Sequence, residues 1–555
     1  MRYFLCSILL LLAFVLCAES LLVKLNERST TRRKDPQKTD RQQYLLPPKR
    51  RNHHYCKSQQ KESSPSKEDD TMKLSEDKNQ RAYPQQTPHS GRHFLPSHPQ
   101  YRHSGAIKKL LSRLINPIRR SAKRRMNKRF MEGWYYKITL PDDEIDNASF
   151  AFIFSVEDPG RNNPSSNLAL SAVQVMGPRD EYLVQADRDD TKFWAWEESQ
   201  GLGCTFEWQN SKASEELTDD CKITAMQPNE WKEKVKTGFQ MLPTRLQGRV
   251  VGHDGTLGGV HEGQGVPGTC DFDMTIRPLS GWGDDEPESD DRKRNKKHSQ
   301  KSTAGWLASF AVFEPHWQVT MADARATGFA TWNGKQYDFE DVPFYAEKNW
   351  GGEFPSKWYW AQCNAFDGYC KPDGSSRLSI TAGGGRRKIP LGQTEDLGMV
   401  SIHYNGKFYE AVPWTGEMEW DVDPWGKWIM RGRCTSGKRL FEAEISAICD
   451  PQTAPPGVVL RAPTRDDGLA YFCRDSFYAE TTLSLWELNY DTDQKEYVRG
   501  EAIIDQAFSK QGAVEVGGGP WWDSWKGKSK MKQPMKSMVK LPYLAQRLQR
   551  KVFRR

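Results

Sequence analysis

Short runs of aromatic and branched apolar residues, several of them alternating with polar residues, constrain what this chain can fold into. The clearest runs are GWYYKITLP, SFAFIFSV, LALSAVQVMG, VSIHYNGKFYEAVPW and KWIMRGR, and residues such as Gly, Pro, Asn and Asp interrupt the sequence between them. Successive side chains of a β-strand point to opposite faces, so a period of two indicates strands with one buried face. Patterns typical of long amphipathic helices are nearly absent. We therefore predict an all-β body of many antiparallel strands.

The length of this body is sufficient for two tandem antiparallel β-barrels, closed or nearly closed. We place one barrel domain in residues 129–305 and the second in residues 306–527. Residues 284–300 of the first domain form a charge-dense insert, DDEPESDDRKRNKKHSQ, which we interpret as a solvated loop near the domain junction. GWYYK at 133–137 and KWYWAQ at 357–362 each begin an aromatic strand. This echo suggests that one half duplicates the other.

Two kinds of turn are predicted within the barrels. The Asn-Gly dipeptide at 405–406 is a strong signal for a tight β-hairpin. Glycine runs at Gly383–Gly385 and Gly517–Gly519 lack the spacing of a phosphate-binding loop, and we interpret them as turns.

The N-terminal part of the chain has the composition of a targeting sequence. Residues 1–20 combine a short charged start, an apolar run and small residues, which is typical of a secretory signal peptide, with an uncleaved anchor as the alternative. Residues 21–128 are basic, rich in Ser and Pro and poor in aliphatic residues, so we predict a disordered, transit-like segment. A signal followed by such a segment indicates import into a plastid bounded by extra membranes, whereas ordinary secretion would explain the first half alone.

Charge is distributed unevenly along the chain. The net charge is +8, yet residues 21–130 hold 28 Lys and Arg against 9 Asp and Glu, and the last thirty residues hold 11 basic and no acidic residues. The body between these ends is therefore acidic. This distribution argues against a nucleic-acid partner for the body, and it favours basic ends, including a tail at 528–555, that serve targeting or touch an anionic membrane.

Motif searches exclude several familiar classes of site. The chain has no GxSxG elbow and no HExxH motif, and its 11 cysteines form no CxxC pair or Cys/His cluster with metal-ligand spacing. We therefore predict neither a metal site nor a disulfide scaffold. Cys363 and Cys370 could form a bridge across a hairpin, but two free buried thiols are the favoured interpretation.

One stretch, YAEKNWGGEFPSKWYWAQCNAF at 345–366, places seven aromatic rings around the adjacent pair Glu347 and Lys348. Burial among such rings raises the pKa of a carboxyl, which can then hold a proton at neutral pH and act as a general acid. Indole and phenol faces also stabilise a cation. Together these properties suit the protonation of an isolated carbon–carbon double bond. The alternative is structural: Glu347 pairs with Lys348 or Lys357 at a barrel rim, and the rings form core.

Longer motifs resemble the tocopherol cyclase family. They are RFMEGWYYKITLP, KSTAGWLASFAVFEPHWQV, YAEKNWGGEFPSKWYWAQCNAF, SITAGGGRRKIP, CRDSFYAE and AVEVGGGPWWDSWKG, and the resemblance extends from about Arg129 to Gly527. It implies cyclisation of dimethyl-phytyl-hydroquinone to γ-tocopherol and of the monomethyl analogue to δ-tocopherol, without a cofactor. It further implies a prenylquinol substrate and a place at the plastoglobule or thylakoid surface.

A more distant resemblance assigns roles to residues. Tyr345-Ala346-Glu347-Lys348-Asn349-Trp350-Gly351 is similar to a Tyr-x-Asp-x-Asn-Trp-Gly segment of carotenoid hydratases and related two-domain lipocalin-like proteins. It implies that both barrels are lipocalin-like, that Glu347 is the acid in place of Asp, and that Tyr345 and an upstream ring, for which Trp317 is the candidate, assist it. The candidate substrate-binding residues are Trp350, Asn349, Lys348, Trp134, Tyr136, Trp358 and Trp360.

Other interpretations of the same residues stay open. Asn349 could equally stabilise a turn and Lys348 could be solvated, and the four aromatic residues at 134, 136, 358 and 360 could be core. A hydratase of an isoprenoid double bond would admit water beside the cation, and a lipocalin-type carrier would use the cavity without an acid. A structural, carbohydrate-facing protein would expose its Trp rings.

Overall fold

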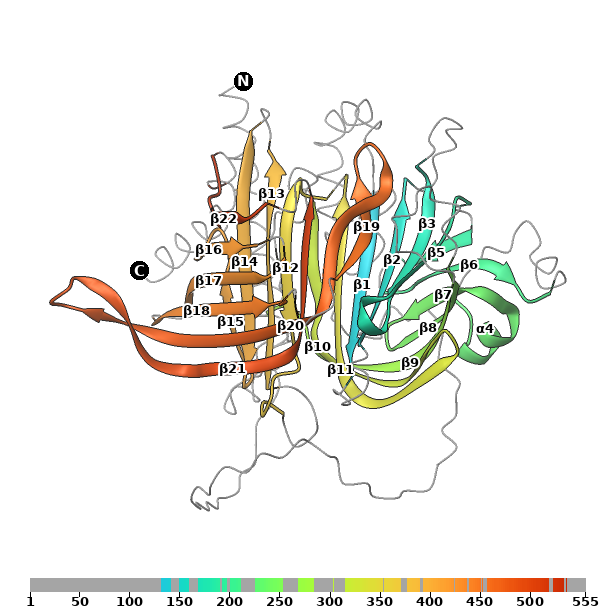
Figure 1. Ribbon diagram of the computed structural model, residues 1–555, viewed down its shortest axis with the longest axis horizontal. Coiled ribbons are helices and arrows are strands. Elements are labelled where there is room, and N and C mark those ends of the chain that lie inside the picture. Colours follow the sequence, from blue (N-terminus) through green and yellow to red (C-terminus); the bar gives the residue numbers. More distant parts are fainter. Residues whose placement is uncertain are drawn as a thin grey trace, which may run out of the picture. The chain divides into compact units, whose positions relative to one another are not determined.

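The structure is a computed structural model, and it describes most of the chain between Met131 and Lys536 (Figure 1). The segments left out of this range are 141–148, 159–167, 190–191, 197–199, 211–224, 253–267, 284–302, 304–314, 353, 371–376, 390–392, 424, 437–438, 451, 453–456, 519–522 and 534–535. The contacts discussed below belong to one compact unit, Gln60–Lys530. The predicted signal peptide, the segment 21–128, the insert 284–300 and most of the tail 528–555 lie outside the described residues.

The first sheet is built from the N-terminal half of the body. Its strand order is β4-β3-β2-β1-β11-β10-β9-β8-β7-β6-β5. The strands are β1 (Met131–Thr139), β2 (Ser149–Glu157), β3 (Leu170–Met176), β4 (Tyr182–Asp187), β5 (Phe193–Ala195), β6 (Leu202–Trp208), β7 (Val235–Leu242), β8 (Arg245–Val251), β9 (Thr269–Ser280), β10 (His316–Trp332) and β11 (Lys335–Gly351). The described residues of this half also form the 3-10 turn η1 (Pro178–Asp180) and the α-helix α4 (Pro228–Lys234).

The second sheet is built from the C-terminal half. Its order is β15-β14-β13-β12-β21-β20-β18-β17-β16-β22, and β19 also pairs with β20. The strands are β12 (Lys357–Cys363), β13 (Leu378–Lys388), β14 (Thr394–Tyr404), β15 (Lys407–Ala411), β16 (Glu417–Val422), β17 (Lys427–Ser436), β18 (Arg439–Ile448), β19 (Val458–Thr464), β20 (Gly468–Asp491), β21 (Glu496–Gly518) and β22 (Trp525–Lys528).

The predicted all-β, antiparallel fold is confirmed, because every described ladder in both sheets is antiparallel. The two sheets share one topology: the first strand of each, β1 or β12, pairs with the last long strand, β11 or β21. The aromatic segments that echo each other in sequence are these first strands. Strands β10 and β11 belong to the first sheet. The division between the sheets therefore lies after Gly351, not between residues 305 and 306 where we placed the start of the second domain.

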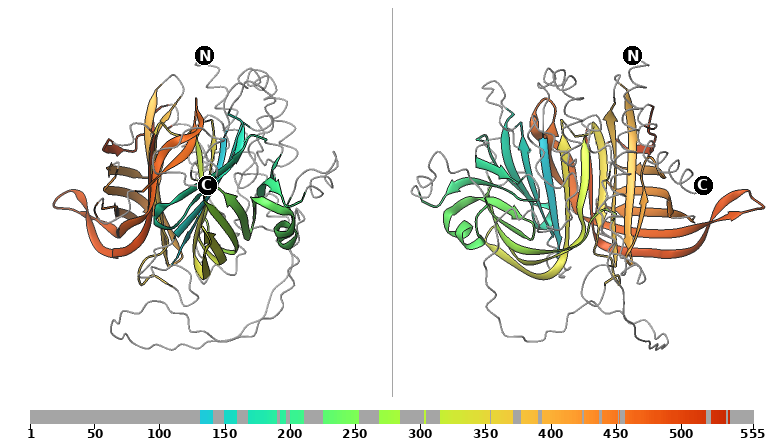
Figure 2. Two further views of the ribbon diagram at one scale, coloured as in Figure 1. Left: turned by 45° about the vertical axis from the view of Figure 1, so that its right-hand side comes forward. Right: turned by 180° about the vertical axis from the view of Figure 1, so that it is seen from behind.

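Both sheets curl into half-barrels, and Figure 2 shows their curvature. In the first, Gln185 of β4 reaches back to β7 and β8: it donates to Oγ1 of Thr237 at 3.1 Å and accepts from the backbone N–H of Val251 at 3.1 Å. In the second, the residues after β22 bridge to β14, where the Lys530 N–H donates to the Asp396 carbonyl at 2.9 Å. The concave face of each sheet holds its own apolar core. This agrees with the alternating sequence pattern, which predicts that each strand buries one face.

Local turn predictions had mixed outcomes. Asn405 and Gly406 have φ angles of 48° and 76° and connect β14 to β15, as the hairpin signal predicted. The prediction that Gly383–Gly385 is a turn is wrong, because this run lies inside β13, and Gly517 lies inside β21. Glycine is needed there because large rings cross the strands: a Cβ at Gly517 would lie 2.0 Å from the Trp358 ring. Cys363 and Cys370 are not joined by a disulfide, as favoured, but only Cys363 is buried, whereas Cys370 is half-buried.

The convex faces of the two sheets meet in a third apolar cluster, which we call the seam. The seam residues include Tyr135, Val184, Val319 and Tyr345 from the first sheet and Trp358, Trp360, Phe408, Leu460 and Phe477 from the second. Polar contacts cross it as well: the Lys137 ammonium donates to Oε1 of Gln362 at 3.1 Å, and the Gln174 amide donates to the Arg461 carbonyl at 3.1 Å. The seam is therefore a packed interface with buried polar groups, and it positions the site described next.

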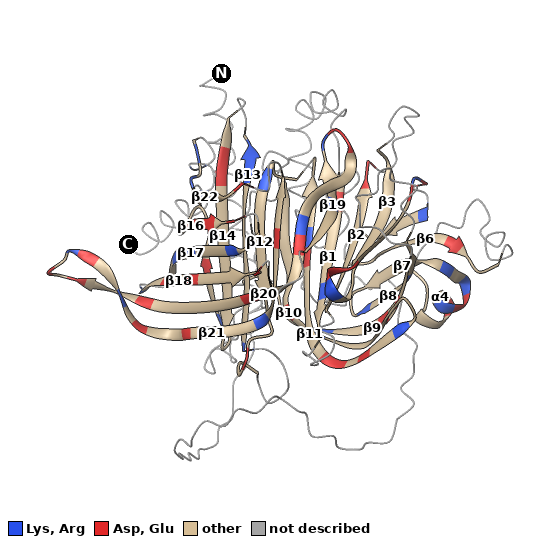
Figure 3. Ribbon diagram, viewed as in Figure 1, with Lys and Arg blue, Asp and Glu red and all other residues tan. Residues whose placement is uncertain are grey.

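No helix among the described residues is long and apolar enough to cross a membrane. The β20–β21 hairpin extends well beyond its neighbours and carries charges of both signs (Figure 3). At its end Tyr490 and Tyr497 are exposed and pack edge to face with 5.3 Å between ring centroids.

Candidate active site

Glu347 lies at the centre of the seam because of strand alternation in β11. Tyr345, Glu347 and Asn349 share one face of the strand, and this face points away from the core of the first half-barrel. The register sets Tyr135 of β1 opposite Glu347 on one side and Val319 of β10 on the other. The carboxyl is therefore carried on a central, doubly paired strand, and its side chain is 7% exposed.

Four donors surround the carboxyl group. Oε2 accepts from the Tyr345 hydroxyl at 2.6 Å, from the Trp317 indole N–H at 2.8 Å and from the Trp360 indole N–H at 3.0 Å. Oε1 accepts from the Asn349 amide at 3.1 Å. Since Oε2 already holds three donors, Oε1 is the oxygen with room for a transferable proton.

Burial and hydrogen bonding act in opposite directions on this acid. Burial raises the pKa of Glu347 above the usual value of a glutamate, and the four hydrogen bonds, which favour the charged form, oppose the rise only in part. The same donors would stabilise the carboxylate that remains once a proton has left. The site thus combines burial that favours the protonated acid with a prepared environment for its conjugate base.

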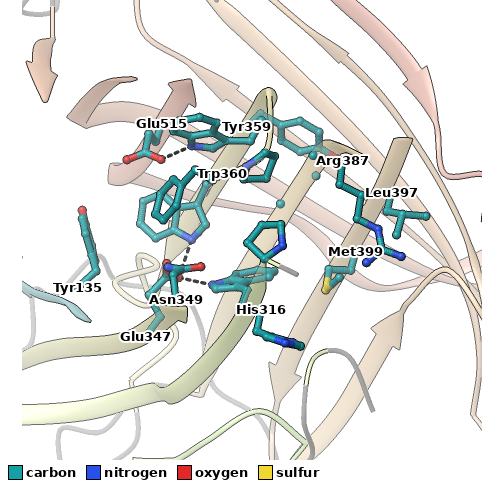
Figure 4. Close-up of a pocket in the computed structure, with 18 residues that line it drawn as sticks. Tyr135, His316, Glu347, Asn349, Tyr359, Trp360, Arg387, Leu397, Met399 and Glu515 are labelled. Atoms are coloured by element: carbon teal, nitrogen blue, oxygen red, sulfur yellow. Dashed lines mark hydrogen bonds between the residues drawn. The ribbon is translucent and has the colours of Figure 1, made fainter. Parts of the chain in front are cut away.

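Glu347 lines a pocket of about 150 Å³, open to solvent on one side, between the two sheets (Figure 4). Its wall is mainly aromatic and apolar, with a few polar groups, as in small-molecule sites. The residues that line the pocket are Tyr135, Pro315, His316, Trp317, Glu347, Asn349, Phe354, Pro355, Trp358, Tyr359, Trp360, Gly383, Gly384, Gly385, Arg387, Leu397, Met399 and Glu515. Both sheets therefore contribute, and neither half of the chain could form this site alone.

The glycines of β13 keep part of the pocket open. A Cβ at Gly383 would lie 3.4 Å from the Trp317 ring, and one at Gly384 would lie 2.5 Å from the Tyr359 ring. Larger residues at these positions would fill the space beside the two rings. Gly383–Gly385, which we predicted as a turn, is thus a strand segment without side chains that forms part of the pocket wall.

Five of the predicted site residues meet Glu347 or the pocket. Trp317, Asn349 and Trp360 do both, Trp358 lines the pocket, and Tyr345 is fully buried behind Glu347 and bonds to it. Since the Tyr345 hydroxyl touches the carboxyl but is absent from the pocket wall, its geometry suits orientation of the acid.

The other predicted residues point to the opposite face. Lys348 forms a 2.6 Å ion pair with Glu132 inside the first half-barrel, where both side chains are fully buried, and Trp350 stacks on His316. Trp134 and Tyr136 belong to the core of the same half-barrel. None of these four predicted residues lines the pocket.

Alternation within the strand is the sequence signal that separates these groups. In β11 the odd positions around Glu347 face the seam and the even positions face the core, and in β1 Tyr135 faces the seam while its neighbours Trp134 and Tyr136 do not. Treating every aromatic residue near Glu347 as a wall residue ignored this period of two.

Sequence reasoning missed most of the other pocket residues, among them Tyr135 and Glu515 on other strands. Tyr135 packs edge to face on Trp360 at 5.2 Å between centroids and donates to Oδ2 of Asp475 at 3.2 Å. Glu515 of β21 accepts a hydrogen bond from the Trp358 indole. Glu515 stands in AVEVGGGPWW, far along the chain from Glu347, and no local pattern marks it as a partner.

Comparison with known proteins gives consistent matches. The family model described as tocopherol cyclase-like matches residues 128–518. The chain is 38% identical to "Tocopherol cyclase, chloroplastic" of Zea mays over 423 residues, which cover 74% of this chain and 80% of that protein. It is 39% identical to "Probable tocopherol cyclase, chloroplastic" of Oryza sativa subsp. japonica over 408 residues, 72% and 77% of the two chains.

A solved structure of a putative AttH from Nitrosomonas europaea aligns at 11% identity with a TM-score of 0.32, covering 70% of this chain and 92% of that chain. This similarity is too low to support a statement about fold or function. The family match and the two plant relatives span most of the all-β body. The chain therefore belongs to the tocopherol cyclase-like family.

Proposed function

We propose that this protein is a tocopherol cyclase, an isomerase of the intramolecular lyase class that closes the chromanol ring of a phytyl-hydroquinone. The observation that carries the proposal is the setting of Glu347: a carboxyl bonded by a phenol and two indoles at the wall of an apolar pocket. The names of the maize and rice relatives agree with it. The substrates are dimethyl-phytyl-hydroquinone, which gives γ-tocopherol, and the monomethyl analogue, which gives δ-tocopherol.

The reaction starts with proton transfer. Oε1 of Glu347 donates its proton to the first double bond of the prenyl chain, and a tertiary carbocation forms. The rings of Trp317, Trp358 and Trp360 line the pocket and stabilise this cation, each by roughly 0.5–2 kcal/mol. A phenolic oxygen of the same substrate then attacks. Because nucleophile and cation share one molecule, the shape of the pocket selects the folded conformation and the new stereocentre.

Three observations favour a cyclase over a carrier. A carrier needs an apolar cavity but no acid, whereas here three donors converge on one carboxylate oxygen. Burying a carboxyl group costs free energy, and a cavity that only binds an apolar ligand gains nothing from that cost. The carboxyl also faces the pocket instead of a charged partner: the nearby Lys348 points to the other face and pairs with Glu132.

The decisive experiment incubates the purified protein with reduced phytyl-hydroquinone and separates the products by chromatography. We expect chromanol from the wild type and at least about 100-fold less from Glu347→Gln, because general acid catalysis contributes about 10²–10⁴-fold. Lys357→Gln is the matched control, since the half-buried Lys357 donates to the Asp523 carbonyl and lies outside the pocket wall. Binding without product would support the carrier, and a tertiary alcohol would support the hydratase.

We propose a plastid location at the surface of a plastoglobule or thylakoid, in accord with the chloroplastic names of the relatives. A lipid substrate must reach the pocket from a membrane or lipid body, so we expect reversible binding to lipid surfaces and no nucleic-acid partner. Flotation with liposomes tests the first part: the protein should rise with the lipid. Protein that stays at the bottom of the gradient at every lipid composition would contradict it.

A further inference from the structure

A second carboxyl group lies in the same pocket. Glu515 of β21 lines the pocket wall and is half-buried, because part of its surface faces the open space. Its Oε1 accepts a hydrogen bond from the Trp358 indole. Figure 4 shows Trp360 drawn between Glu515 and Glu347. The resemblance to the hydratase segment does not reach this residue, and the mechanism above gives it no role.

The two acids are held in parallel ways by one strand. Trp358 and Trp360 lie two residues apart on β12 and so point to the same face; Trp358 bonds to Glu515 and Trp360 bonds to Glu347. Trp360 is also the cross-strand neighbour of Glu515 in the β12–β21 ladder. Glu347 therefore comes from the first sheet and Glu515 from the second, and the indole pair stands between them.

The chemistry of the cyclisation needs a proton acceptor as well as a donor. When the phenolic oxygen bonds to the cationic carbon, its O–H bond must break, and the proton needs a base within hydrogen-bond reach. Glu347 has just become a carboxylate, but its Oε2 is occupied by three donors and its Oε1 faces the carbon it protonated. If a second carboxylate on the other side of Trp358 and Trp360 accepted the phenolic proton, Glu347 would have to act only as the acid.

We propose that Glu515 is the base that accepts the phenolic proton, and that the hydroquinone ring therefore binds at the Glu515 end of the pocket. This rests on the proposed cyclase function. The step balances: the alkene carbon gains the proton of Glu347, the phenolic O–H bond breaks, the new C–O bond forms, and the released proton moves to Glu515. The proton then returns to Glu347 through solvent as product leaves, so a turnover consumes none.

The charges around Glu515 suit this role. Burial raises its pKa to about 7; the hydrogen bonds from Trp358 and from the Cys473 thiol lower it, and the charge of Glu347 raises it. On β20, Asp475 is the cross-strand neighbour of Glu515, and burial raises the pKa of Asp475 well above its usual value. Burial thus disfavours the charged form of both neighbouring acids, and Glu515, with a pKa of about 7, can lose its proton near neutral pH.

The groups from β1 complete the surroundings. Tyr135 donates to Asp475, and Lys137, whose pKa burial lowers to about 8, faces Asp475 and Cys363. Among the described residues, the charge of Glu347 acts on Glu515, and the charges of Glu515 and Asp180 act on Asp475. Of these acids, Glu515 lines the pocket and would touch the phenolic proton, so we assign the acid limb of the pH profile to it.

The test compares the wild type, Glu515→Gln and Asp475→Asn with reduced phytyl-hydroquinone between pH 5.5 and 9. Gln keeps an acceptor for the Trp358 indole, and Asn replaces the Asp475 carboxyl by an uncharged group of the same shape. We expect the wild-type kcat to fall below about pH 7, as Glu515 becomes protonated. Glu515→Gln should lower kcat about 100-fold and abolish the fall in kcat below about pH 7. Asp475→Asn should keep the wild-type kcat and its fall below about pH 7. Formate should partly restore Glu515→Ala by replacing the missing base.

A second substrate separates this inference from the proposed function. The hydroquinone methyl ether has no phenolic proton at the attacking oxygen, so proton transfer to Glu515 plays no part in its reaction. In D₂O, protonation of its double bond is measured as deuterium incorporated into the prenyl chain. Wild type and Glu515→Gln should exchange equally, and Glu347→Gln should not. If Glu515→Gln forms chromanol at the wild-type rate with an unchanged pH profile, Glu515 is not the base and the cyclase function stands. If the wild type neither exchanges nor cyclises, the function itself fails.

Discussion

The indole N–H of Trp360, in the second sheet, donates a 3.0 Å hydrogen bond to Oε2 of Glu347, in the first sheet. The candidate acid is thus completed by a residue from the other half of the chain. The bond also crosses the seam where the two convex faces pack. Docking of the two half-barrels and assembly of the acid are therefore the same event.

Replacing Trp360 by Phe should weaken the acid. The bond favours the charged form of Glu347, so its loss raises the pKa of Glu347 and moves the alkaline limb of kcat to higher pH. A hydrogen bond to a charged group contributes about 1.5–3 kcal/mol, so we expect a fall in kcat of about 10–100-fold. The pH profile of chromanol formation measures both effects. Trp358→Phe is the matched control, because its indole bonds to Glu515 and should leave the alkaline limb in place.

Replacing Gly383 by Val should block the pocket without touching Glu347. A Cβ there already lies 3.4 Å from the Trp317 ring, so two further methyl groups would occupy space that the substrate needs. We expect KM for phytyl-hydroquinone to rise about 10-fold or more, in line with about 1–3 kcal/mol for a steric change in an apolar pocket. Lys388→Val, on an exposed part of the same strand, should leave KM unchanged. Equal KM values for the two variants would show that substrate does not pass Gly383.

Replacing Lys348 by Met should destabilise the fold. Its ammonium pairs with Glu132 at 2.6 Å where both are fully buried, and its loss leaves a buried carboxylate without this cation. Breaking such a pair costs about 3–5 kcal/mol, which denaturant unfolding would measure. Adding Glu132→Gln should recover much of this loss. The folded double variant should keep its cyclase rate, and a rate lost despite normal stability would mean that Lys348 acts on the substrate.

Stability should depend on pH through Asp180. Burial raises the pKa of Asp180 to about 7, well above the usual value of an aspartate, although the Ser476 hydroxyl and the Phe477 N–H donate to its carboxyl and oppose this rise. A carboxyl whose pKa is higher in the folded state binds its proton more tightly there, so it stabilises the fold at low pH and loses this effect as pH rises from about 4 to 7. Asp180→Asn should remove this dependence, which amounts to roughly 4 kcal/mol at most.

The measurement is denaturant unfolding of both proteins at pH 5 and pH 8. The difference in unfolding free energy, variant minus wild type, should be larger at pH 8. Other acids titrate in both proteins and cancel in this comparison, among them Glu442, whose hydrogen bonds to Arg433 and Arg499 outweigh burial and lower its pKa. A difference that does not change with pH would mean that Asp180 is already ionised at pH 5.

The site residues that could be predicted lie close together in the sequence. Glu347, Tyr345, Asn349, Trp358 and Trp360 stand within one stretch of sixteen positions, so a single segment with a short turn carries them all to the seam. Lys348 and Trp350 were included because they are adjacent in sequence. Their opposite orientation follows from the strand period, which the prediction recognised for the fold and did not apply to the site.

The sequence by itself determined that this chain forms antiparallel strands, where the Asn405-Gly406 hairpin turns, and which carboxyl stands among aromatic rings, because alternation, turn chemistry and composition act over a few residues. Only the tertiary structure decided that Glu515, Tyr135 and the glycines of β13 share a pocket with Glu347, and that the first sheet continues to Gly351. Those contacts join strands distant in sequence. Sheet order and packing of the convex faces set them, and no local pattern encodes either.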